Sequence, residues 1–432
     1  MKMMPLVRGW KTELAPTPEQ ITLFMKGCGT DRFAYNWGLA WNENVYLHNQ
    51  LPHERLKNPS SIDLHKELNK LKKEKFPWMY EVTKQAPQEA LRHLETAFSR
   101  FFKRLGGYPN FKSRKKHGIG SFSLNDGVTV YSDHVAIPTI GDVRLKERGY
   151  LPSNHVLGAT VSYKAGRWFI SIQAKTAIPV KIIEDGCSGT DVGIKHHHAT
   201  VSQQTIDSKE KEEYTRDITP QIKQLQRELD FLDRKISHKP EGSKRKELMK
   251  LKRQRKYKRL SDIVNDSNHK HSHYLTTTFS KNCIERLNIR GMVKNHDLAR
   301  QIQVRAFGEF GRQMEYKAGW YGSMTMYPPE GMRYPSTQRC SKCGHVLEGD
   351  ERLGLSDREF VCPRCGFRKE RDLNSGGNLC AVALSYRAIR KAATRPNNQT
   401  WRREVTSPTQ GLVPVDETSN KPEMAQECGL RV

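Results

Sequence analysis

Four cysteines near the C-terminus have the spacing of a metal-binding module. They form two Cys-x-x-Cys pairs separated by eighteen residues, namely Cys340 with Cys343 and Cys362 with Cys365. Four thiolates at this separation can hold one tetrahedral zinc ion. A glycine follows each pair, Gly344 or Gly366, and permits the tight turn that each pair needs. Buried apolar cysteines are the alternative, which four residues at this spacing do not favour. The sequence therefore predicts a structural zinc site.

Three acidic residues stand where they could serve catalysis. Asp372 follows Cys365 by seven residues, at a point where a helix could begin. Asp191 lies on an apolar strand between glycines, and Glu285 lies on or just after a short strand. A carboxylate on a buried strand is costly unless it is paired or binds a cation. Converging carboxylates could hold Mg²⁺, which favours oxygen ligands, and two such ions roughly 3.5–4 Å apart promote phosphodiester hydrolysis. Spacing alone leaves open whether the three meet.

The charge of the chain points to a polyanionic partner. Its 432 residues carry a formal net charge of +26, with a sequence pI of about 9.7. Nucleic acid is the first candidate and an anionic membrane surface the second. The membrane alternative is weak, because no signal-peptide pattern and no long apolar run occurs, so we expect no membrane partner. The length allows two or three domains.

The remaining five cysteines are scattered and odd in number, which favours a reducing cytoplasm over a disulfide framework. They are Cys28, Cys187, Cys283, Cys380 and Cys428.

Two basic segments are candidates for nucleic-acid contact. The first is a loop that contains Lys112, Arg114, Lys115 and Lys116. The second is a helical hairpin over 219–263, with its turn at 239–243 and an apolar stripe that begins at Ile222. Its second arm includes Lys252, Arg253, Arg255 and Lys256. A solvated helix face is the alternative, but the charge is one-sided rather than mixed in sign, which favours nucleic acid.

The elements that must position these residues change in character along the chain. An opening strand over 6–14 leads to a helix capped by Thr17, with Pro18 at its first position, and two further helices follow. Short strands over 121–175 predict an antiparallel barrel or sandwich, which the opening strand would join, leaving the helices as an insertion. The run His196–His198 is expected at a strand edge or turn rather than in a metal site. The segment 394–432 is expected to be a disordered tail.

Several motifs resemble the TnpB family, the transposon-encoded relatives of type V CRISPR effectors. The similar segments are 32–37, 107–112, 189–193, 285–289, 291–295, the two cysteine pairs and 371–374. They cover nearly the whole chain except the tail, and the C-terminal ones occur in the family's order.

The resemblance implies an α+β multidomain fold with an RNase H-like (RuvC) α/β core interrupted by a zinc ribbon. It also implies a wedge-type antiparallel β-barrel with an inserted helical recognition lobe. The expected division is 1–15 and 120–180 for the barrel, 16–119 for the helical lobe, 181–335 and 368–393 for the nuclease core, 336–367 for the zinc ribbon and 394–432 for the tail.

The resemblance further implies an RNA-guided, Mg²⁺-dependent endonuclease that cuts double-stranded DNA, with Asp191, Glu285 and Asp372 as metal ligands. Its partners would be a guide RNA from the transposon end and a target with a short flanking motif. A bacterial or archaeal cytoplasm, close to the nucleoid, would be its location. In family members a longer apolar strand usually leads to the glutamate. Here the strand before Glu285 is expected to be shorter, with Ile284 as the apolar residue next to the glutamate. A guided DNA-binding repressor without strong cleavage is therefore the alternative. A transposase in its own right is less favoured, because no end-recognition feature of its own is visible.

Overall fold

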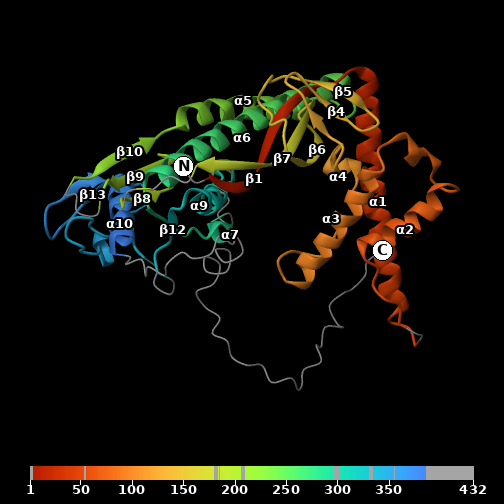
Figure 1. Cartoon of the computed structure of the whole chain (residues 1–432). Coiled ribbons are helices and arrows are strands. Elements are labelled where there is room, and N and C mark those ends of the chain that lie inside the picture. The colour runs from red at the N-terminus through yellow and green to blue at the C-terminus, as the bar shows by residue number, and fades with distance from the viewer. Residues whose placement is uncertain are drawn as a thin grey trace.

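The structure is a computed structural model that describes residues 3–52, 55–179, 183, 185–205, 210–292, 294, 302–329, 334–354 and 356–385. A helical lobe and a seven-stranded sheet form one end of the molecule, and a five-stranded sheet with a small cysteine-rich module forms the other (Figure 1). The predicted α+β class is confirmed. The predicted disordered tail lies outside the described residues.

The seven-stranded sheet is antiparallel throughout, in the order β2-β6-β7-β1-β5-β4-β3. Its strands are β1 (Met3–Ala15), β2 (Ser121–Leu124), β3 (Thr129–Val130), β4 (His134–Ile137), β5 (Gly141–Leu145), β6 (Val156–Lys164) and β7 (Arg167–Pro179). The opening strand β1 joins the later strands as predicted, because it pairs with β7 from Met3 opposite Pro179 to Leu14 opposite Trp168. In the described residues β2 and β3 are the two edges of this sheet, so the pairings do not close it into the predicted barrel.

The turn between β6 and β7 is a two-residue hairpin. Ala165 and Gly166 both have positive φ, at 54° and 80°, which is the conformation of a type I′ turn. Beneath the strands, Phe24 of the first helix packs between Phe122 and Trp168. The helical lobe is thus attached to the sheet through a shared core.

The helical lobe is inserted between β1 and β2. It contains α1 (Pro18–His48), α2 (Ser61–Lys72), the 3₁₀ helix η1 (Pro77–Glu81), α3 (Gln85–Phe102) and α4 (Arg114–His117). The predicted cap of the first helix is confirmed: the Gln20 amide donates to the Thr17 hydroxyl and the Thr17 amide donates to the Gln20 side chain. The helix α3 ends at Phe102.

The second sheet is mixed, in the order β10-β9-β8-β11-β12. Its strands are β8 (Cys187–Asp191), β9 (His198–Gln203), β10 (Glu212–Arg216), β11 (Lys281–Ile284) and β12 (Met324–Met326). The first three are antiparallel neighbours, whereas β8, β11 and β12 run parallel. The helix α10 (Arg371–Ser385) packs on β8 and β9, and α9 (Phe307–Tyr321) packs on the long helix α6.

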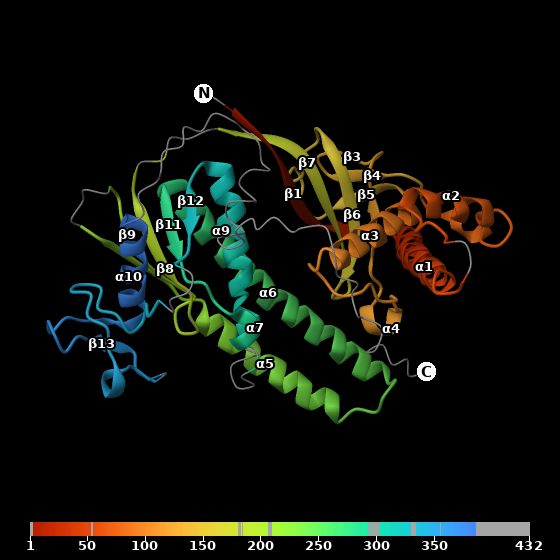
Figure 2. The ribbon, with the colours of Figure 1, turned by 90° about the horizontal axis from the view of Figure 1, so that it is seen from below.

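The basic hairpin is formed by α5 (Thr219–Ser237) and α6 (Lys244–Thr278), which lie side by side and extend from the five-stranded sheet (Figure 2). The predicted apolar stripe is confirmed, because Ile222, Leu225 and Leu229 pack with Leu260 and Val264. The second arm is longer than predicted: it continues to Thr278 rather than ending near Ile263. The apolar contact between α5 and α6 extends past the basic part of α6, because Leu260 and Val264 lie in this contact. Further along α6, Leu275 is also buried.

The short elements α7 (Ile289–Met292), η2 (Gly349–Glu351), β13 (Glu359–Val361) and β14 (Arg368–Glu370) complete the described chain. None of the described helices combines the length and apolar character that a membrane crossing requires.

The strand β8 and the helix α10 approach each other so closely that only glycine fits between them. A Cβ at Gly189 would lie 2.0 Å from the Cys380 nitrogen and 2.3 Å from the Gly376 oxygen. The contacted atoms belong to the backbone and cannot rotate away. The absence of a side chain at Gly189 therefore fixes the distance between β8 and α10.

We expect Gly189→Ala to destabilise the protein by about 3 kcal/mol, because the added methyl group pushes α10 away from the sheet. The matched control is Gly319→Ala in α9, where a Cβ meets nothing within 4 Å. Alanine should stabilise that helix by roughly 0.5–1 kcal/mol. Thermal unfolding followed by circular dichroism compares the two variants. Equal midpoints for Gly189→Ala and the wild type would contradict the close contact.

Candidate functional site

The three candidate carboxylates are carried to one edge of the five-stranded sheet by three elements. Asp191 is the last residue of β8, and Glu285 directly follows β11. These parallel strands pair in register, with Ile284 opposite Thr190, so Asp191 and Glu285 leave the sheet at the same level. Asp372 lies in the first turn of α10, and its Oδ2 would be 3.5 Å from a Cβ at Gly193. The strand before Glu285 is indeed short, at four residues, yet its register suffices to reach the level of Asp191.

The site concentrates negative charge where water is scarce. Asp191 and Asp372 are both buried. Burial raises the pKa of Asp191 well above the usual range, and the nearby carboxyls of Glu285 and Asp372 raise it further. Arg371 donates from Nε and Nη2 to Asp372 Oδ1 at 3.3 and 3.4 Å, which orients that carboxylate. A bound cation would relieve the repulsion among the three acids.

The geometry of the acids differs from that of a single tight metal cluster. The ligand atoms of the four cysteines all lie within 4.8 Å of one another, and among the described residues no other group of three or more potential ligands is as compact. The three carboxylates are spread more widely. A two-metal site tolerates this spread, because its ligands are shared between ions roughly 3.5–4 Å apart.

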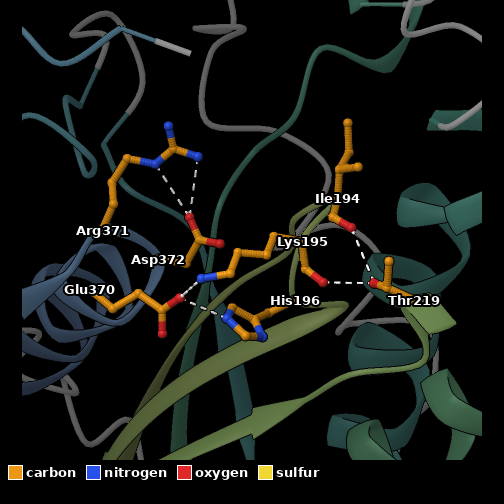
Figure 3. A network of polar contacts seen from close by, with 7 residues as sticks. All are labelled: Ile194, Lys195, His196, Thr219, Glu370, Arg371 and Asp372. Carbon is orange, nitrogen blue, oxygen red and sulfur yellow. Dashed lines mark hydrogen bonds and ion pairs between the residues drawn. The ribbon is translucent and has the colours of Figure 1, made fainter. Parts of the chain in front are cut away.

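The loop that follows Asp191 is held from both sides (Figure 3). On one side, Glu370 accepts hydrogen bonds from the Lys195 ammonium and from His196 Nε2, the latter at 2.7 Å. On the other, the Thr219 hydroxyl donates to the Lys195 carbonyl at 2.7 Å. Arg305 donates to the Ile194 carbonyl as well. The start of α5 and the end of β14 therefore fix this loop beside Asp372.

The four cysteines form a site that fits zinc. Cys340 Sγ lies 3.7 Å from Cys365 Sγ, and Cys343 Sγ lies 3.6 Å from Cys362 Sγ. Tetrahedral coordination with Zn–S bonds of about 2.3 Å places the sulfurs about 3.8 Å apart. A hydrogen bond from the His345 amide lowers the pKa of the Cys343 thiol to about 7, which favours the thiolate that a metal needs.

The turns predicted at the two cysteine pairs are confirmed. The Gly344 and Gly366 amides donate to the Cys340 and Cys362 carbonyls, each at 2.9 Å. Both glycines have positive φ, at 79° and 68°. The two halves of the cysteine module therefore repeat one local structure.

Two asparagines connect the first cysteine pair to the helix that carries Asp372. Asn374 donates to the Arg339 carbonyl at 2.7 Å and accepts from the Ser341 amide at 3.0 Å. Asn378 donates to the Ser336 carbonyl at 2.8 Å and also to the Arg339 carbonyl. The sequence motif contained Asn374, but nothing in its spacing revealed this contact. Nor did it reveal the role of Glu370, since both depend on tertiary packing.

The histidine run lies where the sequence placed it. His196 and His197 belong to the connection between β8 and β9, and His198 begins β9. The Nε2 atoms of His197 and His198 lie 2.8 and 3.1 Å from Asn268 Oδ1. Burial lowers the pKa of His197 to about 4, so its ring is neutral at neutral pH. Among the described residues these histidines join no group of three metal ligands.

The predicted basic contacts divide into exposed and internally paired side chains. Arg114, Lys115 and Lys116 are exposed on α4. Lys112 is different: its ammonium lies 3.5 Å from the buried Asp31 carboxylate and 3.8 Å from the centre of the Tyr35 ring. This pairing gives Lys112 a structural role.

The same division holds on α6. Lys252 is exposed, whereas Arg253 contacts Asp233 at 2.8 Å and Lys256 contacts Glu228 at 2.6 Å, which joins α6 to α5. Arg255 Nε donates to the Ala165 carbonyl at 3.4 Å, in the turn between β6 and β7. These three side chains hold the hairpin together and attach it to the seven-stranded sheet.

Comparison with known proteins finds two family models that match parts of the chain. Residues 307–379 match the family model "Cas12f1-like, TNB domain", and residues 3–50 match the helix-turn-helix model of OrfB proteins of IS605. In the structure residues 3–50 form a strand followed by one long helix.

Relatives extend the similarity along the chain. A protein of Streptomyces pristinaespiralis, named as an RNA-guided DNA endonuclease, is 28% identical over 389 residues, which covers 89% of this chain and 92% of the relative. InsQ of Escherichia coli K12, with the same type of name, is 26% identical over 408 residues and covers 88% and 93%. The TnpB-like protein L79 of Acanthamoeba polyphaga mimivirus is 28% identical over 165 residues, which is 37% of this chain and 30% of that protein.

The chain is similar to TnpB-family proteins over most of its length. The cryo-EM structure of Cas12f1 in a complex with sgRNA and target DNA shares its fold, with a TM-score of 0.55 and 11% identity over 87% of this chain and 99% of that one. This similarity agrees with the motifs that the sequence displays, including the cysteine module within the matched TNB region.

Zinc should hold the cysteine module and, through Asn374 and Asn378, the first turn of α10. We expect freshly purified protein to carry about one zinc ion per chain and Cys362→Ser to lose it. Metal analysis by mass spectrometry measures the content, and hydrogen exchange measures protection around Asp372, which should fall in the variant. Lys342→Ala, an exposed residue of the same module, is the control and should keep both. Zinc-free wild-type protein would contradict this expectation.

Proposed function

We propose that this TnpB-like chain is an RNA-guided endonuclease that hydrolyses double-stranded DNA with divalent metal, expected to be Mg²⁺. The observation that carries the proposal is the placement of Asp191, Glu285 and Asp372 at one edge of the mixed sheet. Relatives named as RNA-guided DNA endonucleases, similar over about nine-tenths of the chain, support the same activity.

The proposed architecture assigns each region a part. The five-stranded sheet, with three antiparallel strands followed by two parallel ones, is taken as the RNase H-like (RuvC) core, interrupted by the zinc ribbon. The seven-stranded sheet is taken as the wedge-like barrel region and the inserted helices as the recognition lobe. A net charge of +26 supports a guide RNA and a DNA target as the partners. A bacterial or archaeal cytoplasm, near the nucleoid, is the proposed location.

The residues of the site fit a divalent cation of the Mg²⁺ class. All three side chains offer carboxylate oxygens. Burial, together with the nearby carboxyls of Glu285 and Asp372, raises the pKa of Asp191 and so disfavours its ionised state when no cation is near. Bound Mg²⁺ supplies Lewis acidity that lowers the pKa of water and stabilises the leaving oxygen.

The protein contributes position and exclusion of solvent. Asp191 is fixed by the strand ladder of β8, and Arg371 orients Asp372. Glu370 and Thr219 hold the loop between them, so the acids are preorganised before substrate arrives. Guide pairing would select the target, and a short flanking motif would be read by the protein. The repressor alternative depended on a short strand that would misplace Glu285. The register of β11 with β8 weakens that argument, because it brings Glu285 to the level of Asp191.

Each of the three carboxylates should be required for cutting. With guide RNA and Mg²⁺, wild-type protein should cut a matched duplex that carries the flanking motif. Asp191→Ala, Glu285→Ala and Asp372→Ala should each lower the rate at least about 100-fold while guided binding persists. Ca²⁺ should support binding but little cleavage.

Asp350→Asn, an exposed acid of the zinc module, is the control and should cut normally. Cleavage is followed on gels and binding by filter retention. A wild-type protein that binds its target tightly yet never nicks it in Mg²⁺ or Mn²⁺ would replace the nuclease with the repressor alternative.

The exposed basic side chains should contribute to RNA binding more than the paired ones. Replacing Arg114, Lys115, Lys116 and Lys252 with alanine should lower RNA affinity and reduce the slope of log K against log salt by about 0.7–0.9 for each lost phosphate contact. Arg253→Ala with Lys256→Ala, which breaks ion pairs to α5, should lower thermal stability with a smaller change in slope. An unchanged slope in the exposed-residue variant would contradict the assignment.

A further inference from the structure

The end of α3 and the segment after it expose aromatic rings to solvent. Phe102 is 71% exposed, Tyr108 44% and Phe111 48%. Single exposed apolar side chains are common in soluble proteins, but several together mark a contact surface. We name these three residues the ring track.

Two of these rings, Phe102 and Tyr108, are held in place by neighbouring rings. Phe101 packs against Tyr108 at 5.3 Å with an interplanar angle of 87°, and against Phe102 at 5.4 Å. Phe98 supports Tyr108 in the same edge-on manner at 5.7 Å. Edge-on packing restricts the rotamers of the rings and leaves the outer rings much of their surface.

The chain segment that follows the ring track lies along α1 and contains the short basic helix α4. Tyr108 lies near Glu43, the Lys112 backbone exchanges two hydrogen bonds with Asn36, and Arg32 donates to the Gly118 and Ile119 carbonyls. The segment therefore runs antiparallel to α1 over about 16 Å, at 1.5 Å per helical residue. The exposed side chains of Arg114, Lys115 and Lys116 lie near its end.

Positive charge also surrounds the rings themselves. Arg100, Lys103 and Arg104 are exposed at the end of α3, next to Phe102. Basic side chains interleaved with exposed rings are the arrangement by which proteins hold single-stranded nucleic acid, the rings stacking on bases and the cations meeting phosphates.

We propose that the ring track stacks on unpaired bases of the RNA that this chain carries. The inference rests on the proposed function, since it takes the guide RNA as the partner. An apolar surface that stayed bare would favour aggregation, so a permanently bound RNA is a better occupant than a DNA strand present only during cutting. A second copy of the chain is disfavoured, because pairing two such surfaces would bring their basic rims together.

The test removes the aromatic faces while keeping apolar side chains. A triple variant, Phe102→Leu with Tyr108→Leu and Phe111→Leu, is compared with the full-length wild type. The probes are a fluorescein-labelled oligouridine and a blunt RNA duplex of equal length. Stacking contributes enough per base that the triple variant should bind oligouridine about 100-fold more weakly. Duplex binding, which depends on phosphates, should change less than about threefold.

The controls separate stacking from general damage. Tyr150→Leu removes a ring that is 50% exposed outside the helical lobe and should leave both affinities unchanged. Phe102→Trp should retain oligouridine binding. Photo-crosslinking of the co-purified RNA, substituted with 4-thiouridine, should mark peptides that contain the ring track.

Two results would overturn the inference, and a third would contradict the proposed function alone. Equal oligouridine affinity in the triple variant and the wild type would overturn it while guided cleavage stands. A dimer of RNA-free protein in light scattering that the triple variant converts to monomer would assign the surface to a second copy instead. Ring-dependent RNA binding in a protein that never cuts or finds a guided target would contradict the proposed function and not the stacking.

Discussion

The close backbone contact between β8 and α10 is the constraint on which the candidate site depends. Gly189 has no side chain, so the helix can lie directly on the strand that ends at Asp191. The same helix carries Asp372 in its first turn and contacts the cysteine module through Asn374 and Asn378. The cysteine module and the position of Asp372 are therefore linked through one helix. A helix displaced by a single methyl group would move Asp372 and the module together.

The second determinant is the clustering of acidic side chains around the buried Asp191, which a bound cation would stabilise. Burial and the neighbouring carboxyls of Glu285 and Asp372 raise the pKa of Asp191, whereas the chain as a whole carries a formal net charge of +26. A basic surface would attract a polyanion, and the acidic site would repel its phosphates unless a metal ion intervened. Attraction of a nucleic acid would thus require positive charge over the surface, whereas metal binding at the candidate site would require negative charge. The ion pairs within the α5–α6 hairpin show that part of the positive charge serves the fold instead.

Local chemistry explains what the sequence could predict. The cysteine spacing, the Thr17 cap and the apolar stripe of α5 each depend on neighbours in the chain, and the structure confirms them. The sequence did not predict features that depend on contacts distant in the chain. These are the open edges of the seven-stranded sheet, the length of α6 and the pairing of Lys112 with Asp31. The register of β11 against β8 is of this second kind. A short strand looked insufficient for Glu285 because the sequence does not reveal where its partner strand ends.

The most direct measurement is Mn²⁺ binding to zinc-loaded protein, followed by electron paramagnetic resonance. If Asp191, Glu285 and Asp372 form one cation site, the wild type should take up Mn²⁺ in competition with Mg²⁺. Replacing Asp191 or Asp372 with asparagine should abolish that uptake, because the substitution removes a charged oxygen ligand without changing the side-chain volume. Asp350→Asn, remote from the site in sequence and exposed, should bind as the wild type does. Identical Mn²⁺ titrations of the wild type and the Asp191→Asn variant would contradict a shared cation site.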